Sequence, residues 1–172
     1  LKLKMKKSYI NDLIKIFEVF NGLFTKLTKV VSTIDFLNSG AICALSYNYN
    51  KPNLNIDNDK SFINAKGIRH PIIERIIKSS YVKHDIQVGT KDCNGILLYG
   101  LNSAGKSSLM KSVGLNIILA QIGYFVACDK FDFYPFQSIF TRIESTDNIF
   151  KGLSSFALEL VELKAILKRS GR

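Results

Sequence analysis

The stretch Gly100-Leu101-Asn102-Ser103-Ala104-Gly105-Lys106-Ser107 decides the fold class of this 172-residue chain. It fits the pattern G-x-x-x-x-G-K-[ST] of a phosphate-binding loop at every defined position. In such a loop the glycines permit a tight turn whose backbone N–H groups point inward and form a nest for an anion. A compact apolar run, 95–99, precedes the loop, and a helical pattern from Lys106 to about Ile122 follows it. A buried strand, a glycine-rich loop and a helix in this order predict an α/β domain that binds a nucleoside triphosphate.

The residue types in and after the loop predict ATP and Mg²⁺ as cofactors and an ATPase as the activity. Lys106 would bring a mobile positive charge to the β- and γ-phosphates, and the Ser107 hydroxyl would be the Mg²⁺ ligand. The helix that follows would present its unsatisfied N–H groups and its positive dipole end to the same phosphates. The predicted nucleotide-binding residues of this segment are Gly100, Leu101, Asn102, Ser103, Ala104, Gly105, Lys106, Ser107 and Ser108.

The first 60 residues have the pattern of a helical arm. Over 9–34, apolar residues recur at three- and four-residue spacing, which predicts a long helix bent near Gly22. A second helix is expected over 35–49, and the Asn- and Pro-containing stretch 48–59 has the composition of a boundary loop. We therefore expect residues 1–60 to form a lever rather than an enzyme core.

Residues 61–172 are expected to form an incomplete P-loop ATPase domain of the ABC-like type. A short apolar run lies at 62–65, the further strands predicted here are 124–128, 130–133 and 138–143, and a last helix is predicted over 156–167. A Walker B carboxylate, which holds the Mg²⁺ shell in such enzymes, stands at the end of an apolar strand. The one apolar run of this kind downstream of the loop ends at Asp129 and has no Glu after it. We therefore expect the Walker B strand to be missing.

Composition sets broader limits. Lys and Arg (24) outnumber Asp and Glu (14) to give a net charge of +10, but the lysines are scattered, so nucleic-acid contact stays open. Cys43, Cys93 and Cys128 stand apart from one another and from both histidines, which favours reduced, buried thiols over a zinc site. No signal peptide and no apolar window long enough to span a bilayer are apparent, so we expect a soluble, intracellular protein with no membrane partner.

Several segments around the loop resemble the ATPase domain of the MutS mismatch repair family. Asn102 stands where that family carries Asn in its P-loop, and the segments 67–74, 122–126, 139–143 and 152–159 resemble its R-H-P, I-G-x-x-V, I-F-T-R and G-x-S-T-F-x-x-E motifs. The segments follow one another in the family's order over about residues 30–168, so together they are specific. The stretches 47–49 and 152–154 are similar to the viral and organellar branch.

The sequence also departs from the family pattern. Ser103-Ala104 replaces Met-Gly in the loop, Ser108 replaces a common Thr, and Ala127 replaces a Pro. Leu153 stands where Arg is frequent, which puts a contact between subunits by that arginine in doubt.

The resemblance implies two further site residues. Tyr81 falls where the family stacks an aromatic ring on adenine, with Val82 beside it, although a tyrosine at a strand edge would look the same in sequence. Ser154 falls on the signature-loop serine, which reaches the γ-phosphate of the other subunit and would act with Lys106 and Ser107 in catalysis. A plain helix N-cap before Phe156 is the alternative interpretation of Ser154, and the two roles are compatible.

The resemblance also implies a larger assembly. ATP would bring two ATPase domains together as a homo- or heterodimer and drive a clamp on mismatched or structured DNA, which domains before residue 1 would contact. The chain lacks an initial Met and stops directly after a helical pattern, so we expect a fragment that binds ATP but hydrolyses it poorly. Two alternatives stay open, namely another ABC-type P-loop ATPase and a truncated nucleotide-binding remnant without catalysis.

Overall fold

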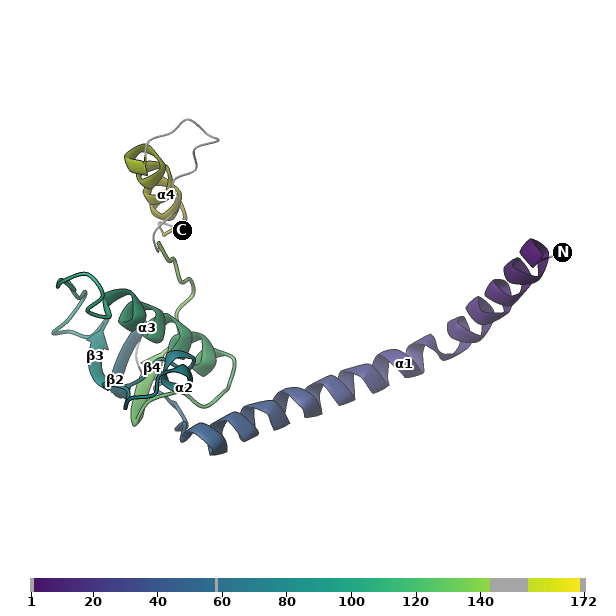
Figure 1. Cartoon of the computed structure of the whole chain (residues 1–172), viewed down its shortest axis with the longest axis horizontal. Coiled ribbons are helices and arrows are strands. Elements are labelled where there is room, and N and C mark those ends of the chain that lie inside the picture. The colour runs from purple at the N-terminus through teal and green to yellow at the C-terminus, as the bar shows by residue number, and fades with distance from the viewer. Residues whose placement is uncertain (1, 58, 143–154, 171–172) are drawn as a thin grey trace. The chain divides into compact units, whose positions relative to one another are not determined.

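The chain divides into two compact units, Leu1–Tyr47 and Asn48–Arg172 (Figure 1). The computed structural model describes residues 2–57, 59–142 and 155–170. The second unit is a mixed α/β structure built around a small mixed sheet.

The first unit is a single helix, α1, which runs without interruption from Lys2 to Tyr47 (Figure 1). The prediction of a long helix is confirmed, whereas the prediction of a separate helix over 35–49 is wrong. No proline occurs in this helix, and a single glycine such as Gly22 or Gly40 costs only about 1 kcal/mol, which is too little to end it.

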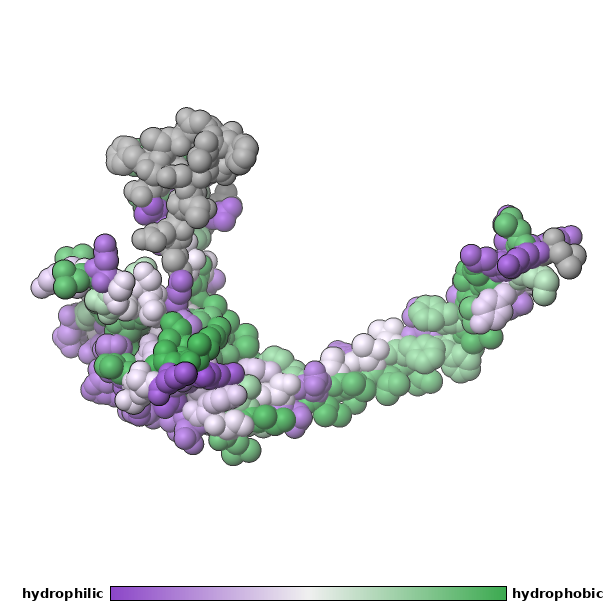
Figure 2. All heavy atoms as spheres, in the orientation of Figure 1, coloured by the Kyte–Doolittle hydropathy of each residue, from purple (hydrophilic) through white to green (hydrophobic). Residues whose placement is uncertain are grey.

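The apolar side chains of α1 are exposed along its whole length. None of its residues is buried, and Figure 2 shows apolar side chains over much of the helix. Among the described helices, α1 alone is long and apolar enough to span a bilayer, with a mean hydropathy of 1.2 over its best 18-residue window. The expectation that no apolar window is long enough to span a bilayer is therefore wrong for α1. One such helix near the N-terminus is weak evidence for a membrane span, and the expected absence of a membrane partner stays a prediction.

The second unit is organised by a four-stranded sheet. In chain order its elements are β1 (Asn53–Leu54), β2 (Phe62–Ile68), α2 (Ile73–Ile76), β3 (His84–Val88), α3 (Lys106–Gln121), β4 (Lys130–Tyr134) and α4 (Ser155–Ser170). The strands lie in the order β1-β4-β2-β3, with β2 antiparallel to both of its neighbours and β1 parallel to β4. The predictions of the helices α3 and α4 and of strand β4 are confirmed.

One face of the sheet packs against α3. Alternate residues of each strand point to this face, and in the register Ala65 lies between Ile86 of β3 and Phe131 of β4. Ile117 and Ala120 of α3 belong to the same buried cluster. Because this burial stabilises the contact between α3 and the sheet, the start of α3 is held in a fixed place above the strands.

A bulge in β2 requires a glycine at Gly67. The register shifts between Ala65 and Ile68, and Gly67 lies there with a φ of 60°. A Cβ atom at this position would overlap the carboxylate of Asp129, and the Gly67 amide donates to Oδ1 of Asp85 at 2.8 Å. A side chain here would therefore clash with Asp129 and strain the backbone.

Three strand predictions are wrong. Residues 95–99 form no strand and are exposed, because none of the described strands offers this run a hydrogen-bonding partner. Within 124–128 only Val126 pairs, in one bridge to Asn50, although 126–128 are fully buried. The stretch 138–142 is irregular, and residue 143 of that predicted strand lies outside the described residues.

The cysteines differ in burial. Cys128 is fully buried, and burial raises the pKa of its thiol to about 12, so it is held as an unreactive thiol. Cys43 and Cys93 are half-buried, so the expectation of buried thiols holds in full only for Cys128.

Candidate nucleotide site

The loop before α3 turns through two left-handed residues. Ser103 has a φ of 64°, and Gly105, with a φ of 91°, is the N-cap residue of α3. Left-handed backbone is easily adopted by glycine and is rare for serine. The turn therefore brings the loop tightly onto the first residue of the helix, Lys106.

The first amides of α3 have no protein acceptor. Gly105 offers no side-chain cap, and within the described part of the chain the N–H groups of Lys106, Ser107 and Ser108 donate to no other residue. Ala104 donates only a long bond of 3.3 Å to the Leu101 carbonyl. Three successive free donors at a helix N-terminus, where the helix dipole is positive, form an anion-binding position.

The ammonium group of Lys106 lies against the loop itself. Its Nζ donates to the carbonyl oxygens of Gly100 at 2.7 Å and Leu101 at 2.6 Å. These are ordinary backbone acceptors, which a phosphate oxygen with a full negative charge can replace. The ammonium group of Lys106 therefore places a positive charge at the loop that precedes the free amides.

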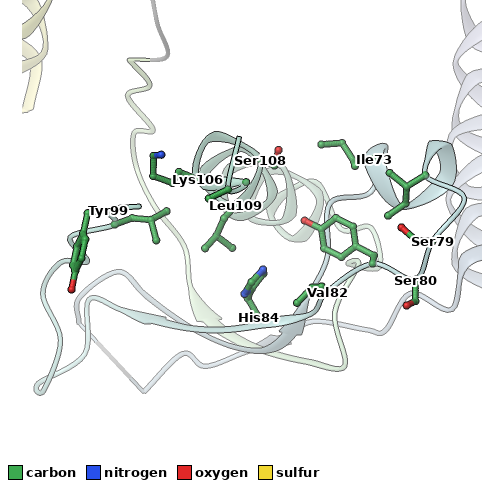
Figure 3. Close-up of a pocket in the computed structure, with 14 residues that line it drawn as sticks. Ile73, Ser79, Ser80, Val82, His84, Tyr99, Lys106, Ser108 and Leu109 are labelled. Atoms are coloured by element: carbon green, nitrogen blue, oxygen red, sulfur yellow. The ribbon is translucent and has the colours of Figure 1, made fainter. Parts of the chain in front are cut away.

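A pocket of about 430 Å³ opens beside the start of α3 (Figure 3). Ala104, Gly105, Lys106 and Ser108 line it from the helix side, and from the opposite side it is lined by the loop between α2 and β3, which includes Tyr81 and Val82. Figure 3 shows Leu109 projecting from α3 toward Val82 and His84. The other residues that line the pocket are Ile73, Ile77, Ser79, Ser80, Leu98 and Tyr99.

Not every predicted site residue lies at this pocket. The structure brings Tyr81 and Val82 together with part of the loop, although they are about 25 residues apart in sequence. Gly100, Leu101, Asn102, Ser103 and Ser107 belong to the loop and the first turn of α3 but do not line the pocket. Ser154 lies outside the described residues.

The carboxylate of Asp129 forms an ion pair with Lys83. Its two carboxylate oxygens accept from Nζ of Lys83 at 2.7 and 2.9 Å, and Asp129 packs against Gly67 at the bulge. The structure therefore gives Asp129 a partner of its own at the sheet, and the expectation that the Walker B strand is missing stays a prediction. Among the described residues, no three His, Cys, Asp or Glu side chains cluster as they would around a metal ion.

A buried asparagine on α3 fixes the helix to the backbone around it. Asn116 is fully buried, and its Nδ2 donates to the carbonyl oxygens of Arg69 at 3.0 Å and Ser112 at 2.8 Å. Its Oδ1 accepts the amide of Ala127 at 2.7 Å. One side chain thus ties α3 to the end of β2 and to the turn before β4. Sequence reasoning missed this residue, because an asparagine in a helical pattern gives no local signal of tertiary contacts.

The segment that follows β2 is folded around His70. The Nδ1 atom of this buried imidazole accepts the amides of Ile72 and Ile73, both at 3.2 Å, at the start of α2. Ile73 in turn lines the pocket. The R-H-P motif therefore has a structural role, which is to shape the chain that leads to one wall of the pocket.

The pH dependence of stability should report on His70. Burial is the main cause that lowers the pKa of His70 from its ordinary value of 6.5, because the protonated ring would lose its contact with water, and the positive charge of Lys111 lowers it further. Below pH 6.5 the unfolded chain then binds more protons than the folded chain, so the free energy of unfolding should fall as the pH drops from 7 through 6.5 toward the folded pKa.

Urea unfolding between pH 7.5 and 5 measures this effect in the chain and in two variants. The decrease in the free energy of unfolding at low pH should be smaller in His70→Gln. It should persist in His84→Gln, which leaves His70 in place. Equal losses in all three proteins would contradict the role given to His70.

Comparison with known proteins agrees with the resemblance noted in the sequence. A family profile described as MutS domain V matches residues 96–172. The chain is 41% identical, over 96% of its length, to a mutS homologue named for DNA mismatch repair in Acanthamoeba polyphaga mimivirus. It is 34% identical, over 95% of its length, to the mitochondrial mutS homologue of Sarcophyton glaucum. Against the DNA mismatch repair protein MutS of Clostridium botulinum the identity is 40% over 84% of the chain.

The matched relatives are much longer proteins. The chain spans 18% of the mimivirus protein, 17% of the Sarcophyton protein and 15% of the Clostridium protein.

Proposed function

The chain belongs to the MutS family, and we propose that within it the loop 100–107 and the start of α3 bind the phosphates of ATP. The observation that carries the proposal is the row of free amides on Lys106, Ser107 and Ser108 beside a lysine ammonium. Such a row suits a tetrahedral anion, since several donors converge on oxygens that carry negative charge.

The pocket supports a nucleotide rather than a free phosphate. Its volume of about 430 Å³ lies within the range of small-molecule sites, and apolar residues line it beyond the charged end. The phosphates would lie at Lys106, and the base would lie toward Tyr81 and Val82. The Lys106 ammonium would exchange its bonds to the Gly100 and Leu101 carbonyls for bonds to phosphate oxygens.

Mg²⁺ would accompany the triphosphate and neutralise part of its charge. Ser107 is the residue of the loop that would hold it, because its hydroxyl follows Lys106 in the first turn of α3 and oxygen is the ligand that Mg²⁺ prefers. The described residues offer no carboxylate cluster for the ion, so further ligands would come from the phosphates and from water.

The activity of the whole protein follows from this site. ATP binding and hydrolysis by two such domains, with Ser154 of one subunit closing over the phosphates of the other, would drive a clamp on mismatched or structured DNA. The division into a lever over 1–60 and a partial ATPase domain over 61–172 is part of this proposal, as is a soluble, intracellular location. Alone, this chain would bind ATP and hydrolyse it poorly, because the described part of the chain offers no Walker B carboxylate.

A titration with a fluorescent ATP analogue tests the proposal on this chain. Saturable, Mg²⁺-dependent binding is expected with a dissociation constant between about 1 µM and 1 mM, the usual range for substrates of enzymes. Unlabelled ATP should displace the analogue, and AMP at the same concentration should not, since it lacks the β- and γ-phosphates. Absence of saturable binding, or equal displacement by AMP, would leave the chain as a remnant without a triphosphate site.

A further inference from the structure

A buried serine is hydrogen-bonded to two residues that line the pocket, Tyr81 and Ser108. Ser112 is on α3 and fully buried, and its Oγ donates to the carbonyl oxygen of Ser108 at 2.7 Å. The same Oγ lies 3.3 Å from the phenol oxygen of Tyr81. Because a serine hydroxyl has one hydrogen, which Ser108 receives, Tyr81 must be the donor of the second bond. The bonds run from Tyr81 through Ser112 to Ser108 in the first turn of α3.

The loop that carries Tyr81 is not fixed by the backbone hydrogen bonds of a helix or strand. Residues 77–83 belong to no helix or strand, and the bond to Ser112 is the one hydrogen bond found for the Tyr81 side chain among the described residues. Without that bond the ring could rotate about two side-chain torsions in a half-open pocket. The serine hydroxyl thus supplies the polar anchor of an otherwise apolar ring.

We propose that Ser112 is a positioning residue, which holds the Tyr81 ring in the orientation that stacks on the nucleotide base. The inference rests on the proposed function, because it assigns the Tyr81 end of the pocket to the base and the Lys106 end to the phosphates. Ser112 does not line the pocket, so it would touch neither the base nor the phosphates. It acts through Tyr81, and it ties the ring to the helix turn that would hold the phosphates.

The proposal separates two kinds of ligand. ATP uses both ends of the pocket, so its affinity should depend on the anchor. Inorganic tripolyphosphate has no base, so its affinity should depend on Lys106 and not on Ser112 or Tyr81. If Ser112 served only the general stability of the domain, its replacement would weaken the binding of both ligands alike.

Competition titrations on Ser112→Ala, Tyr81→Phe and the double variant test this directly. Each single change removes the hydrogen bond between Tyr81 and Ser112 and should weaken ATP binding about 3- to 10-fold, with tripolyphosphate affinity unchanged. Ser112→Ala also removes the bond within α3 to the Ser108 carbonyl, which does not involve Tyr81. The double variant should be no weaker than either single variant, because both changes delete the same bond. Ser32→Ala is the matched control, since Ser32 on α1 makes a similar bond to the Lys29 carbonyl at 3.1 Å, and it should change neither affinity.

The outcomes separate a failure of the positioning role of Ser112 from a failure of the proposed nucleotide binding. If the unaltered chain binds neither ligand, the proposed function fails. If it binds both and Ser112→Ala leaves ATP affinity unchanged, or if the losses of the two single variants add, the positioning role is wrong and the phosphate site stands. Urea unfolding of each variant shows that the folded state is kept during the titrations.

Discussion

Replacement of Lys106 by alanine should abolish measurable ATP binding. The ammonium of Lys106 is the cation beside the free amides of the α3 N-terminus, and it lies on carbonyl groups that it can leave for phosphate oxygens. A charged hydrogen bond of this kind contributes up to about 3 kcal/mol, which corresponds to roughly a 100-fold loss of affinity. Titration of the fluorescent ATP analogue measures the loss.

Lys111→Ala is the control for this change. Lys111 lies on the same helix, one to two turns further on, and is exposed. Its removal subtracts the same charge from the chain and should change the affinity by less than about 3-fold, because an exposed charge outside the pocket is screened. Equal losses in the two variants would show that net charge, and not the position of Lys106, governs binding.

Replacement of Asn116 by leucine should have the largest effect on stability. The change keeps the size of the side chain but leaves the Arg69 carbonyl and the Ala127 amide without the bonds they now make to Asn116. The bond of the Ala127 amide is buried, and an unsatisfied buried group of this kind costs about 1–3 kcal/mol, so we expect a loss of about 2 kcal/mol or more and a Tm lower by roughly 10 °C. Thermal and urea unfolding give the two values.

Asn94→Leu is the matched substitution in the same unit. Asn94 is exposed and makes no hydrogen bond through its side chain in the described structure. Its replacement should alter stability by less than about 0.5 kcal/mol. If Asn116→Leu also altered the free energy of unfolding by less than about 0.5 kcal/mol, the contacts of Asn116 would not be what holds α3 in place.

Local patterns predicted α3, α4 and a long N-terminal helix, although not its full extent to Tyr47. The spacing of Gly100, Gly105 and Lys106 marks where α3 begins, because the signal lies in neighbouring residues. The period of the apolar residues predicted α4 for the same reason. The family resemblance, rather than any pattern, indicated Tyr81, which the structure places at the pocket.

Strands were harder to predict, because a strand depends on partners far away in sequence. The apolar run 95–99 has the composition of a buried strand, yet no described strand lies beside it to pair with it. The run 126–128 is buried as its composition suggests, but it bends into a turn before β4 instead of extending. Strand β3, with His84, Asp85 and Gln87 exposed, offered too few apolar positions to be noticed.

The polar contacts that shape the site were invisible for a similar reason. Ser112 and Asn116 are polar residues in a helical pattern, and the pattern alone would place them at a solvent-facing surface. Only the tertiary structure shows that they are buried and that their partners come from the segments around Arg69, Tyr81 and Ala127.

An NMR titration of the ¹⁵N-labelled chain with ATP and Mg²⁺ tests the central claim most directly. We expect the amide resonances of Lys106, Ser107 and Ser108 to shift most, since these N–H groups would pass from water to phosphate oxygens. If ATP binds while these three amides keep their positions and other amides shift, the nucleotide lies elsewhere and the phosphate site assigned to the start of α3 is wrong.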